Sequence, residues 1–254
     1  MNTLAGRHAL VTGGGTGIGA AIATTLAHAG ATVTICGRRL QPLQAVAAGH
    51  ANIRAVIADV TDEASLETLY EQAETAGKPF DIDVANAGMA ESKPAHKTSL
   101  DLWNRTLNVN LTGAFLSVKP ALAAMRERRW GRIIFIASTA GLKGYPYVAP
   151  YVAAKHGVVG LSRALALETA AMGITVNAIC PGFAETAMLS DSIDRIAETT
   201  KRSGTNVRAT LAASNPQGRF IQPQEVADAV LWLCGAASAA ITGQAISVSG
   251  GETW

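Results

Sequence analysis

The sequence has few of the residues that build disulfide scaffolds, redox pairs or metal clusters. Its 254 residues include only three cysteines, Cys36, Cys180 and Cys234, and their spacing matches neither metal ligands nor a redox pair. Each cysteine lies in an apolar stretch, so we expect buried thiols in a reducing compartment. A disulfide scaffold is excluded, and we expect no metal site.

Charge is also scarce. Only 16% of the residues are charged, and 21 Lys and Arg against 19 Asp and Glu give a net charge of +2. This balance is too small to indicate nucleic acid or an anionic membrane as the main partner. No apolar run is long enough to span a bilayer, and residues 1–7 lack the apolar segment of a signal peptide. We therefore expect a cytoplasmic protein with no nucleic-acid or membrane partner.

Apolar residues, by contrast, make up 48% of the chain, enough for one sizeable core. Short β-rich runs alternate with longer helical patterns along the whole sequence. The predicted strands are residues 8–12, 32–36, 53–58, 82–85, 132–137, 175–179 and 245–248. The predicted helices are residues 18–29, 40–48, 63–76, 99–129, 150–172 and 223–235. This alternation predicts a single α/β domain over residues 1–254, a doubly wound parallel sheet of about seven strands with helices on both faces.

Two features do not fit this simple alternation. Residues 184–219 are polar and follow the predicted strand 175–179. A long insertion after the carboxyl end of such a strand commonly covers a ligand site, so we interpret it as a substrate lid, with an ordinary surface loop as the alternative. Asp83 places a carboxylate inside an otherwise apolar strand, and the sequence gives no reason for it.

A glycine-rich turn, TGGGTGIG at residues 12–19, follows the first predicted strand and opens the first helix. Glycines let the backbone turn tightly and approach a pyrophosphate, whose charge then faces the helix N-terminus. A plain strand-to-helix connection is the alternative, but the strand before the turn and the helix after it favour a dinucleotide site. The expected cofactor contacts in this turn are Gly13, Thr16, Gly17, Ile18 and Gly19.

The end of the second predicted strand indicates which dinucleotide binds. Gly37 stands where a carboxylate would hold the ribose hydroxyls of NAD. Arg38, together with Arg39, could grip the 2′-phosphate of NADP with forked donors. We therefore favour NADP(H), with NAD(H) as the alternative, in which case both arginines are simply solvated at the start of a helix.

Two further strand ends are expected on the adenosine side of the cofactor. Asp59, followed by Val60, could accept a hydrogen bond from the adenine amino group, or it could cap the turn at Thr61. The run of Asn86, Ala87 and Gly88 would bring backbone close to the adenosine, although a plain turn has the same appearance.

Tyr151 and Lys155 are four residues apart near the start of a predicted helix, so their side chains share a face. A free tyrosine has a pKa near 10, which is too high for efficient proton transfer at neutral pH. A neighbouring ammonium could lower the tyrosine pKa by about 2–3 units, which requires about 3–4 kcal/mol and a site of reduced dielectric. The alternative is an aromatic ring packed on a lysine stem.

Two polar residues accompany this pair. Ser138 ends the fifth predicted strand, where its hydroxyl could donate to a substrate carbonyl, or cap a turn. Asn110 lies inside a predicted helix although asparagine is a mediocre helix former. A bound water linking Lys155 to solvent would explain Asn110, and an exposed helix surface is the alternative.

Taken in order, these residues resemble the single-domain branch of the short-chain dehydrogenase/reductase family, with a Rossmann-type fold. The resemblance covers essentially the whole chain, including Pro181 and Gly182. It implies that Asn110, Ser138, Tyr151 and Lys155 form the catalytic tetrad. It also implies that Tyr151 and Lys155 contact the cofactor, with Lys155 on the nicotinamide ribose, that Thr186 touches the carboxamide, and that the protein is a homotetramer. The sequence departs from the family pattern in two places. Ala85 stands where many members have a second asparagine, and the glycine turn lacks the basic residue that many NADP users carry there.

Residues 150–160 and 177–183 are most similar to 3-ketoacyl-thioester reductases, including polyketide ketoreductases, and to 3-hydroxybutyrate dehydrogenases. The resemblance implies hydride transfer between NADP(H) and a ketone or secondary alcohol, most of all a 3-oxoacyl thioester of CoA or a carrier protein. One alternative is an NAD-dependent dehydrogenase of a 3-hydroxy acid, a sugar alcohol or another small alcohol. A more distant alternative is a non-catalytic nucleotide sensor.

Overall fold

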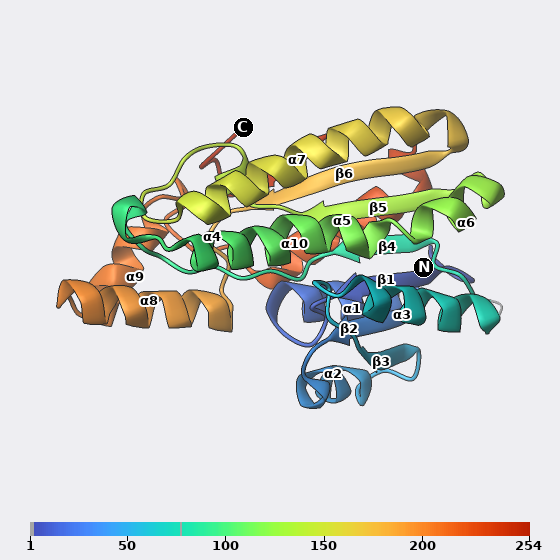
Figure 1. Cartoon of the computed structure of the whole chain (residues 1–254), viewed down its shortest axis with the longest axis horizontal. Coiled ribbons are helices and arrows are strands. Elements are labelled where there is room, and N and C mark those ends of the chain that lie inside the picture. Colours follow the sequence, from blue (N-terminus) through green and yellow to red (C-terminus); the bar gives the residue numbers. More distant parts are fainter. Residues whose placement is uncertain (1–2, 77) are drawn as a thin grey trace.

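The computed structural model of the protein describes residues 3–76 and 78–254 (Figure 1). Within these residues, seven parallel strands form one sheet in the order β3-β2-β1-β4-β5-β6-β7. The strands are β1 (His8–Thr12), β2 (Thr32–Gly37), β3 (Ile53–Ile57), β4 (Ile82–Ala85), β5 (Gly131–Ile136), β6 (Ile174–Pro181) and β7 (Ala245–Val248). The chain winds outward from β1 to β3, returns to the centre at β4 and winds outward again to β7. The predicted doubly wound α/β sheet is confirmed.

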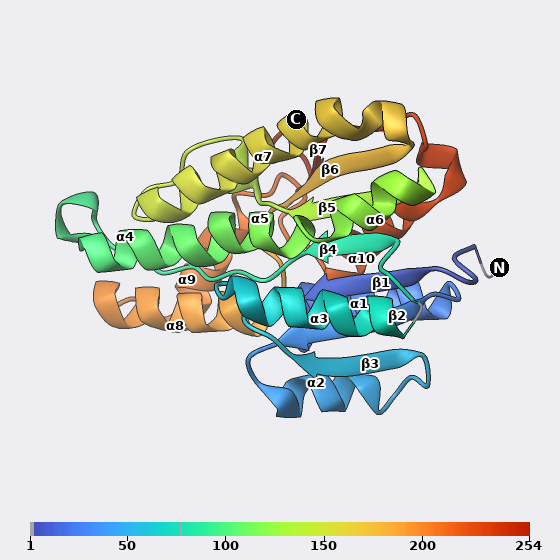
Figure 2. The same cartoon turned by 45° about the vertical axis from the view of Figure 1, so that its right-hand side comes forward.

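Helices cover both faces of this sheet (Figures 1 and 2). The α-helices of the described residues are α1 (Gly17–His28), α2 (Leu40–Ala47), α3 (Glu63–Thr75), α4 (Leu100–Leu107), α5 (Gly113–Val118), α6 (Ala121–Arg128), α7 (Ala149–Thr169), α8 (Ala187–Thr200), α9 (Gly204–Ala212) and α10 (Pro223–Cys234). None of them combines the length and the apolar character needed to cross a bilayer.

Alternate strand residues enter two separate cores, because successive side chains of a strand point to opposite faces. Val11 and Ile35 pack with residues of α1, α2 and α10 on one face. Leu10 and Cys36 pack with residues of α3, α5, α6 and α7 on the other. Both faces are therefore buried, which explains why the strands are apolar almost throughout.

The predicted helix over residues 99–129 is wrong as a single helix. It is divided into α4, a π-helical segment (Asn108–Thr112), α5 and α6. Pro120, which has no backbone N–H to donate, marks the break between α5 and α6. The π-helical segment contains the buried Asn110. Such segments occur frequently at functional sites.

The polar segment 184–219 contains two helices that the sequence pattern did not reveal. Thr186 caps the start of α8 and Ser203 caps the start of α9 through side-chain oxygens that accept backbone N–H groups. The two helices bury a small core of their own, made of Leu189, Ile193 and Val207 together with Phe220. The apolar residues lie mainly on the facing sides of the two helices. The other sides of both helices are mostly polar, so the segment as a whole has a polar sequence.

Asp83 is explained by a partner on a different element. It is fully buried in β4, between Leu10 of β1 and Ile133 of β5, and it accepts a hydrogen bond from the hydroxyl of Tyr70 on α3. Burial raises the pKa of Asp83 to about 8, although the hydrogen bond from Tyr70 opposes the shift. The carboxyl group is therefore mostly protonated at neutral pH.

This raised pKa makes the stability of the fold depend on pH. An unfolded aspartate loses its proton near pH 4, so between that pH and about 8 the folded protein holds a proton that the unfolded chain has released. The free energy of unfolding then falls as pH rises, by at most about 1.4 kcal/mol per pH unit for one group. The free energy of unfolding can be measured by urea denaturation at pH 5 and at pH 8. We expect its decrease between these two pH values to be about 1–3 kcal/mol smaller in Asp83→Asn than in the parent. The exposed Asp101→Asn is the matched control. Equal pH dependence in Asp83→Asn and the parent would refute the assignment.

Candidate active site

The carboxyl ends of β1, β4, β5 and β6 bring the predicted site residues to one edge of the sheet. Thr12 ends β1, and Asn86 directly follows β4. Ser138 lies two residues beyond β5, and Pro181 ends β6. Because the strands are parallel and adjacent, the loops after them are neighbours, at the type of edge where doubly wound sheets bind ligands.

The glycine turn is fastened to the loop after β4 by the side chains of Thr12 and Asn86. The Thr12 hydroxyl accepts hydrogen bonds from the backbone N–H groups of Asn86 (3.0 Å) and Ala87 (3.1 Å). The Asn86 amide donates to the carbonyl oxygens of Thr12 (2.8 Å) and Gly13 (3.3 Å). Sequence reasoning treated Asn86 as a cofactor contact and missed Thr12, although its position at the start of the glycine motif was a usable signal.

Close packing explains two of the glycines. A Cβ on Gly19 would collide with the carbonyl oxygen of Gly13 and with the Asn86 side chain. Gly17 has a positive φ of 53°, and a Cβ there would lie 3.1 Å from Cγ2 of Thr186. The turn after β1 and the loop after β6 are therefore in contact, and the predicted residues Gly17 and Thr186 lie side by side.

The start of α1 is open to a ligand. Thr16 occupies the N-cap position in an extended conformation, is exposed, and makes no side-chain capping hydrogen bond. Ile18 is partly buried and packs against the core beneath the turn. The exposed turn thus sits on an anchored helix, whose N-terminal N–H groups favour an anion.

Arg38 and Arg39 are exposed after β2, and Arg39 is the N-cap residue of α2. Asp59 accepts hydrogen bonds from the backbone N–H (3.0 Å) and hydroxyl (2.8 Å) of Thr61, so it does cap that turn. Partial burial acts to raise the pKa of Asp59, but these hydrogen bonds and the charge of Arg38 outweigh it and lower the pKa. The Arg38 guanidinium therefore lies close enough to Asp59 for its charge to lower the pKa of that carboxyl group.

The remaining predicted cofactor residues lie after the carboxyl ends of β3, β4 and β6. Val60 is buried below α5, where a Cβ on Gly113 would lie 2.9 Å from its Cγ2. Gly88 lies against the side-chain oxygen of Asn110. After Pro181, the N–H of Gly182 donates to the carbonyl oxygen of Val248 (3.0 Å).

Lys155 is buried, and its ammonium donates to the carbonyl oxygen of Ile136 (2.8 Å) at the end of β5. Its Nζ lies 5.6 Å from the centre of the Tyr151 ring. Burial lowers the pKa of Lys155 to about 8. The structure thus places the lysine beside the tyrosine, as predicted.

The predicted direction of the Tyr151 pKa shift is wrong for this structure. Burial raises the pKa of Tyr151, and the hydrogen bond with Ser138 only partly opposes the shift. The main physical reason is the burial of the phenol itself, because removal from water disfavours the charged phenolate. The phenol is consequently held in its protonated form at neutral pH.

Ser138 has the capping role that the sequence left open. Its oxygen accepts the N–H of Ala140 (3.1 Å) and so caps the short 3₁₀ turn Thr139–Gly141. A hydroxyl that accepts in a cap retains its own proton for donation. Because Ser138 also contacts Tyr151, a carbonyl oxygen between the two side chains would meet two O–H donors.

Asn110 is buried, so the exposed helix surface considered from the sequence is wrong. Its amide nitrogen donates to the carbonyl oxygens of Met89 (2.9 Å) and Thr106 (2.9 Å), and its oxygen accepts the N–H of Met89 (3.1 Å). The side chain therefore ties the π-helical segment to the loop after β4, and these three bonds engage both ends of its amide.

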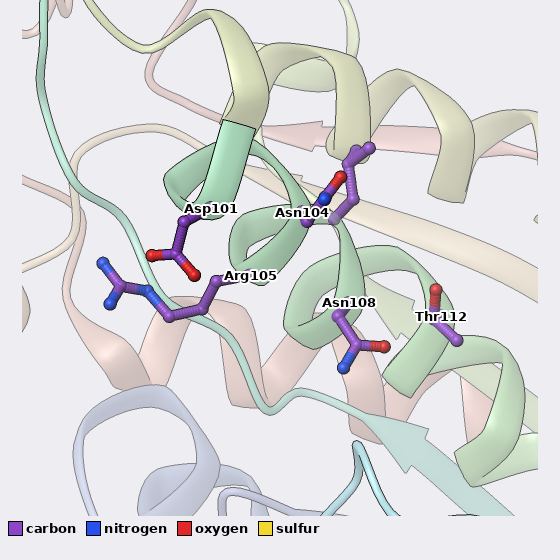
Figure 3. A pocket seen from close by; sticks show the side chains of 6 residues that line it. Asp101, Asn104, Arg105, Asn108 and Thr112 are labelled. Atoms are coloured by element: carbon purple, nitrogen blue, oxygen red, sulfur yellow. The ribbon is translucent and has the colours of Figure 1, made fainter. Parts of the chain in front are cut away.

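A surface hollow of about 520 Å³ lies along α4 and the π-helical segment (Figure 3). It is lined by Asp101, Asn104, Arg105, Leu107, Asn108 and Thr112. Its polar lining includes none of the predicted site residues. Among residues 3–76 and 78–254, no group of three or more His, Cys, Asp or Glu side chains is arranged to hold a metal ion.

Comparison with known proteins gives a consistent result. The family model described as short chain dehydrogenase matches residues 7–197. The chain is 38% identical over 253 residues to the 3-oxoacyl-[acyl-carrier-protein] reductase FabG of Aquifex aeolicus, covering 98% of each chain. It is 39% identical over 253 residues to the cis-4-hydroxycyclohexanecarboxylate dehydrogenase of Sinomonas cyclohexanicum, covering 97% of this chain and 96% of the relative. A solved variant of actinorhodin polyketide ketoreductase with NADPH has a TM-score of 0.92 and 39% identity, covering 97% of each chain.

The packing of Gly19 generates a direct test of the dinucleotide site. In Gly19→Ala the new methyl group must displace the backbone of the turn, and such overpacking costs about 1–3 kcal/mol. We expect NADPH affinity, measured by fluorescence titration, to fall about 10- to 100-fold. Gly160→Ala on α7, where a Cβ meets no atom within 4 Å, should bind NADPH as the parent does. Unchanged affinity in Gly19→Ala would mean that the cofactor binds elsewhere.

Proposed function

Because the chain belongs to the short-chain dehydrogenase family and is an oxidoreductase acting on CH–OH and C=O groups, we propose that it reduces a 3-oxoacyl thioester, or a similar ketone, with NADPH. The observation that carries the proposal is the meeting of Ser138, Tyr151 and Lys155 at the edge of the sheet to which the glycine turn also belongs. The named relative that acts on a 3-oxoacyl carrier-protein thioester supports this choice of substrate.

The residues at the sheet edge fit a dinucleotide. The positive φ of Gly17, the packed Gly19 and the uncapped N-terminus of α1 provide a cradle for a pyrophosphate. Thr16, Gly17, Asn86, Gly182 and Thr186 would hold the two halves of the cofactor. When bound there, the nicotinamide supplies or accepts the hydride.

The side chains of the site handle the proton. In reduction, Ser138 donates a hydrogen bond to the carbonyl oxygen and stabilises the negative charge that develops on it. Tyr151 is protonated at neutral pH because burial raises its pKa, so it can protonate the same oxygen. Lys155, whose pKa is about 8, then returns a proton to the phenol. A water held near Asn110 would link this lysine to solvent.

NADP(H) is the proposed cofactor, held at its 2′-phosphate by Arg38. The exposure of Arg38 supports this assignment, as does the NADPH in the similar polyketide ketoreductase structure. An NAD-dependent dehydrogenase of a small alcohol is the second candidate. It is favoured by the similarity to a dehydrogenase named for a hydroxycyclohexanecarboxylate.

We further propose that residues 184–219 act as a substrate lid over a single catalytic domain. The guanidinium of Arg195 on α8 donates to the carbonyl oxygen of Ala90 (3.3 Å) in the loop after β4, and this contact between the two segments supports the proposal. A cytoplasmic homotetramer remains our expectation. Exposed apolar side chains at Trp103, Phe115 and Leu167 supply surface for subunit contacts.

The proton-donor role of Tyr151 is tested by Tyr151→Phe. Loss of a general acid costs about 10²- to 10⁴-fold in rate, so we expect kcat for acetoacetyl-CoA reduction to fall by that factor while NADPH affinity stays within about twofold. Tyr147→Phe, on an exposed tyrosine of the preceding loop, should keep normal kinetics. A Tyr151→Phe enzyme with parental kcat would disprove the mechanism.

The cofactor assignment is tested by Arg38→Asp. A charged hydrogen bond is worth about 1.5–3 kcal/mol, so the ratio of kcat/KM for NADPH to that for NADH should fall by at least about tenfold. Arg126→Asp, on the exposed end of α6, is the charge-matched control and should leave the ratio unchanged. If the parent already prefers NADH and Arg38→Asp has no effect, the NADP(H) assignment is wrong.

A further inference from the structure

The short 3₁₀ turn after β5 rests on the backbone of α7, at the residue that carries the buried ammonium. Gly141, the last residue of this turn, is buried. A Cβ on Gly141 would lie 2.7 Å from the carbonyl oxygen of Lys155 and 3.1 Å from Cγ2 of Val159. The carbonyl oxygen belongs to the backbone of a long helix, so it cannot shift alone. A side chain at position 141 therefore has no room while α7 keeps its place.

The same turn is fixed to Ser138 by two hydrogen bonds. The side-chain oxygen of Ser138 accepts the N–H of Ala140 (3.1 Å), and its backbone carbonyl oxygen accepts the N–H of Gly141 (2.8 Å). The serine and the turn thus form one stiff unit. Any displacement of Gly141 relative to α7 is consequently passed on to Ser138.

A second contact closes the set. The Lys155 ammonium donates to the carbonyl oxygen of Ile136, two residues before Ser138. Lys155 is therefore held by the end of β5 at two points, through its side chain at Ile136 and through its backbone at Gly141. The two points are joined to each other by Ser138 and the turn. In this closed set of contacts, the separation between β5 and α7 is fixed where the packing is tightest, at Gly141.

Tyr151 belongs to the helix that these contacts hold. It lies one turn before Lys155 on α7 and is hydrogen-bonded with Ser138. A carbonyl oxygen that reacts between Ser138 and Tyr151 must be within hydrogen-bond distance of both hydroxyls. A misplacement of about 1 Å in such a site can lower the rate about 100-fold. The reaction therefore depends on the spacing between this serine and this tyrosine.

We propose that Gly141 is a positioning residue that sets the spacing between Ser138 and Tyr151. Because it has no side chain, it lets the turn lie directly against the backbone of Lys155. The inference rests on the proposed reductase function, since it assigns Gly141 a role in the proton transfer of that reaction. The glycine turn after β1 is anchored separately, to the loop after β4. Gly141 should therefore affect turnover and leave cofactor binding unchanged.

The first test is the kinetics of Gly141→Ala with NADPH and acetoacetyl-CoA. The new methyl group must push the turn away from α7, so we expect kcat to fall about 10- to 100-fold. The Kd for NADPH should stay within about threefold of the parent value. Gly131→Ala is the matched control. It adds a methyl group at the opposite end of β5, where a Cβ would lie 2.5 Å from the sulfur of Met125, and it should keep the parental kcat. A parental kcat in Gly141→Ala would overturn the role of Gly141.

A double-mutant cycle with Ser138→Ala separates positioning from general destabilisation. Removal of the serine hydroxyl should lower kcat about 10²- to 10³-fold in the parent. In Gly141→Ala the serine is already displaced, so the same removal should cost at least about fivefold less. In Gly131→Ala the removal should have its full effect. Equal effects of Ser138→Ala in the parent and in Gly141→Ala would contradict the proposal, because additive losses indicate two independent faults.

A spectroscopic measurement reports on the same spacing without turnover. The chain has four tyrosines, so 3-fluorotyrosine gives a small set of ¹⁹F resonances, and Tyr151→Phe identifies that of Tyr151. Fluorination lowers the pKa of a phenol, which brings its titration to milder pH. The hydrogen bond with Ser138 lowers the pKa of Tyr151, so Ser138→Ala should raise this pKa by at least about 0.5. Gly141→Ala should raise it as well, and the double variant should show no further rise.

The two kinds of failure give different results. A protein that reduces no ketone or thioester would refute the reductase function, and a Tyr151 pKa that depends on Gly141 in that protein would still support the positioning role. Normal reduction, with the Tyr151 pKa unchanged in Gly141→Ala, would overturn the role of Gly141 and leave the reductase function standing. Should Gly141→Ala fail to fold, the same measurements are made on Gly141→Ala combined with Val159→Ala. The shorter side chain gives the new methyl group room on one side, and Val159→Ala alone is the control.

Discussion

The site depends on one buried ammonium. Lys155 is held by the carbonyl oxygen of Ile136, the last residue of β5, and removal from water lowers its pKa to about 8. A charged amine in such a place requires a fixed polar partner, so the end of β5 and the first turns of α7 must keep their relative position. Tyr151, one turn earlier on α7, is thereby placed with its ring 5.6 Å from the ammonium. The geometry of the proton donor follows from that contact.

The parallel sheet brings the rest of the machinery to the same edge. The two windings of the chain separate between β1 and β4, and the Thr12 hydroxyl joins the loops at that point. The glycine turn is consequently fixed to the loop after β4, and Gly17 meets Thr186 from the loop after β6. Cofactor groups and proton-transfer groups thus belong to one connected set of strand ends, which is a condition for hydride and proton to reach the same carbonyl.

Much of this could be predicted from the sequence because it depends on local patterns. Apolar runs and glycine turns predicted the strands, and the spacing of Tyr151 and Lys155 predicted their shared helix face. The features that could not be predicted depend on contacts between distant segments. The hydrogen bond from Tyr70 to Asp83 and the ion pair of Glu252 with Lys143 each join residues from different elements. The π-helical segment at Asn110 has no distinct sequence period. The raised pKa of Tyr151 follows mainly from its burial, which the sequence does not show.

The central claim is that the ionisation of Tyr151 is coupled to the ammonium of Lys155. It is tested most directly by the pH dependence of kcat for alcohol oxidation in the parent and in Lys155→Met. The account predicts a rate in the parent that rises with pH through an apparent pKa shared by the pair. In Lys155→Met the same transition should move up by at least about one pH unit, because the buried phenol loses its neighbouring cation. An unchanged pH profile in Lys155→Met would contradict the account.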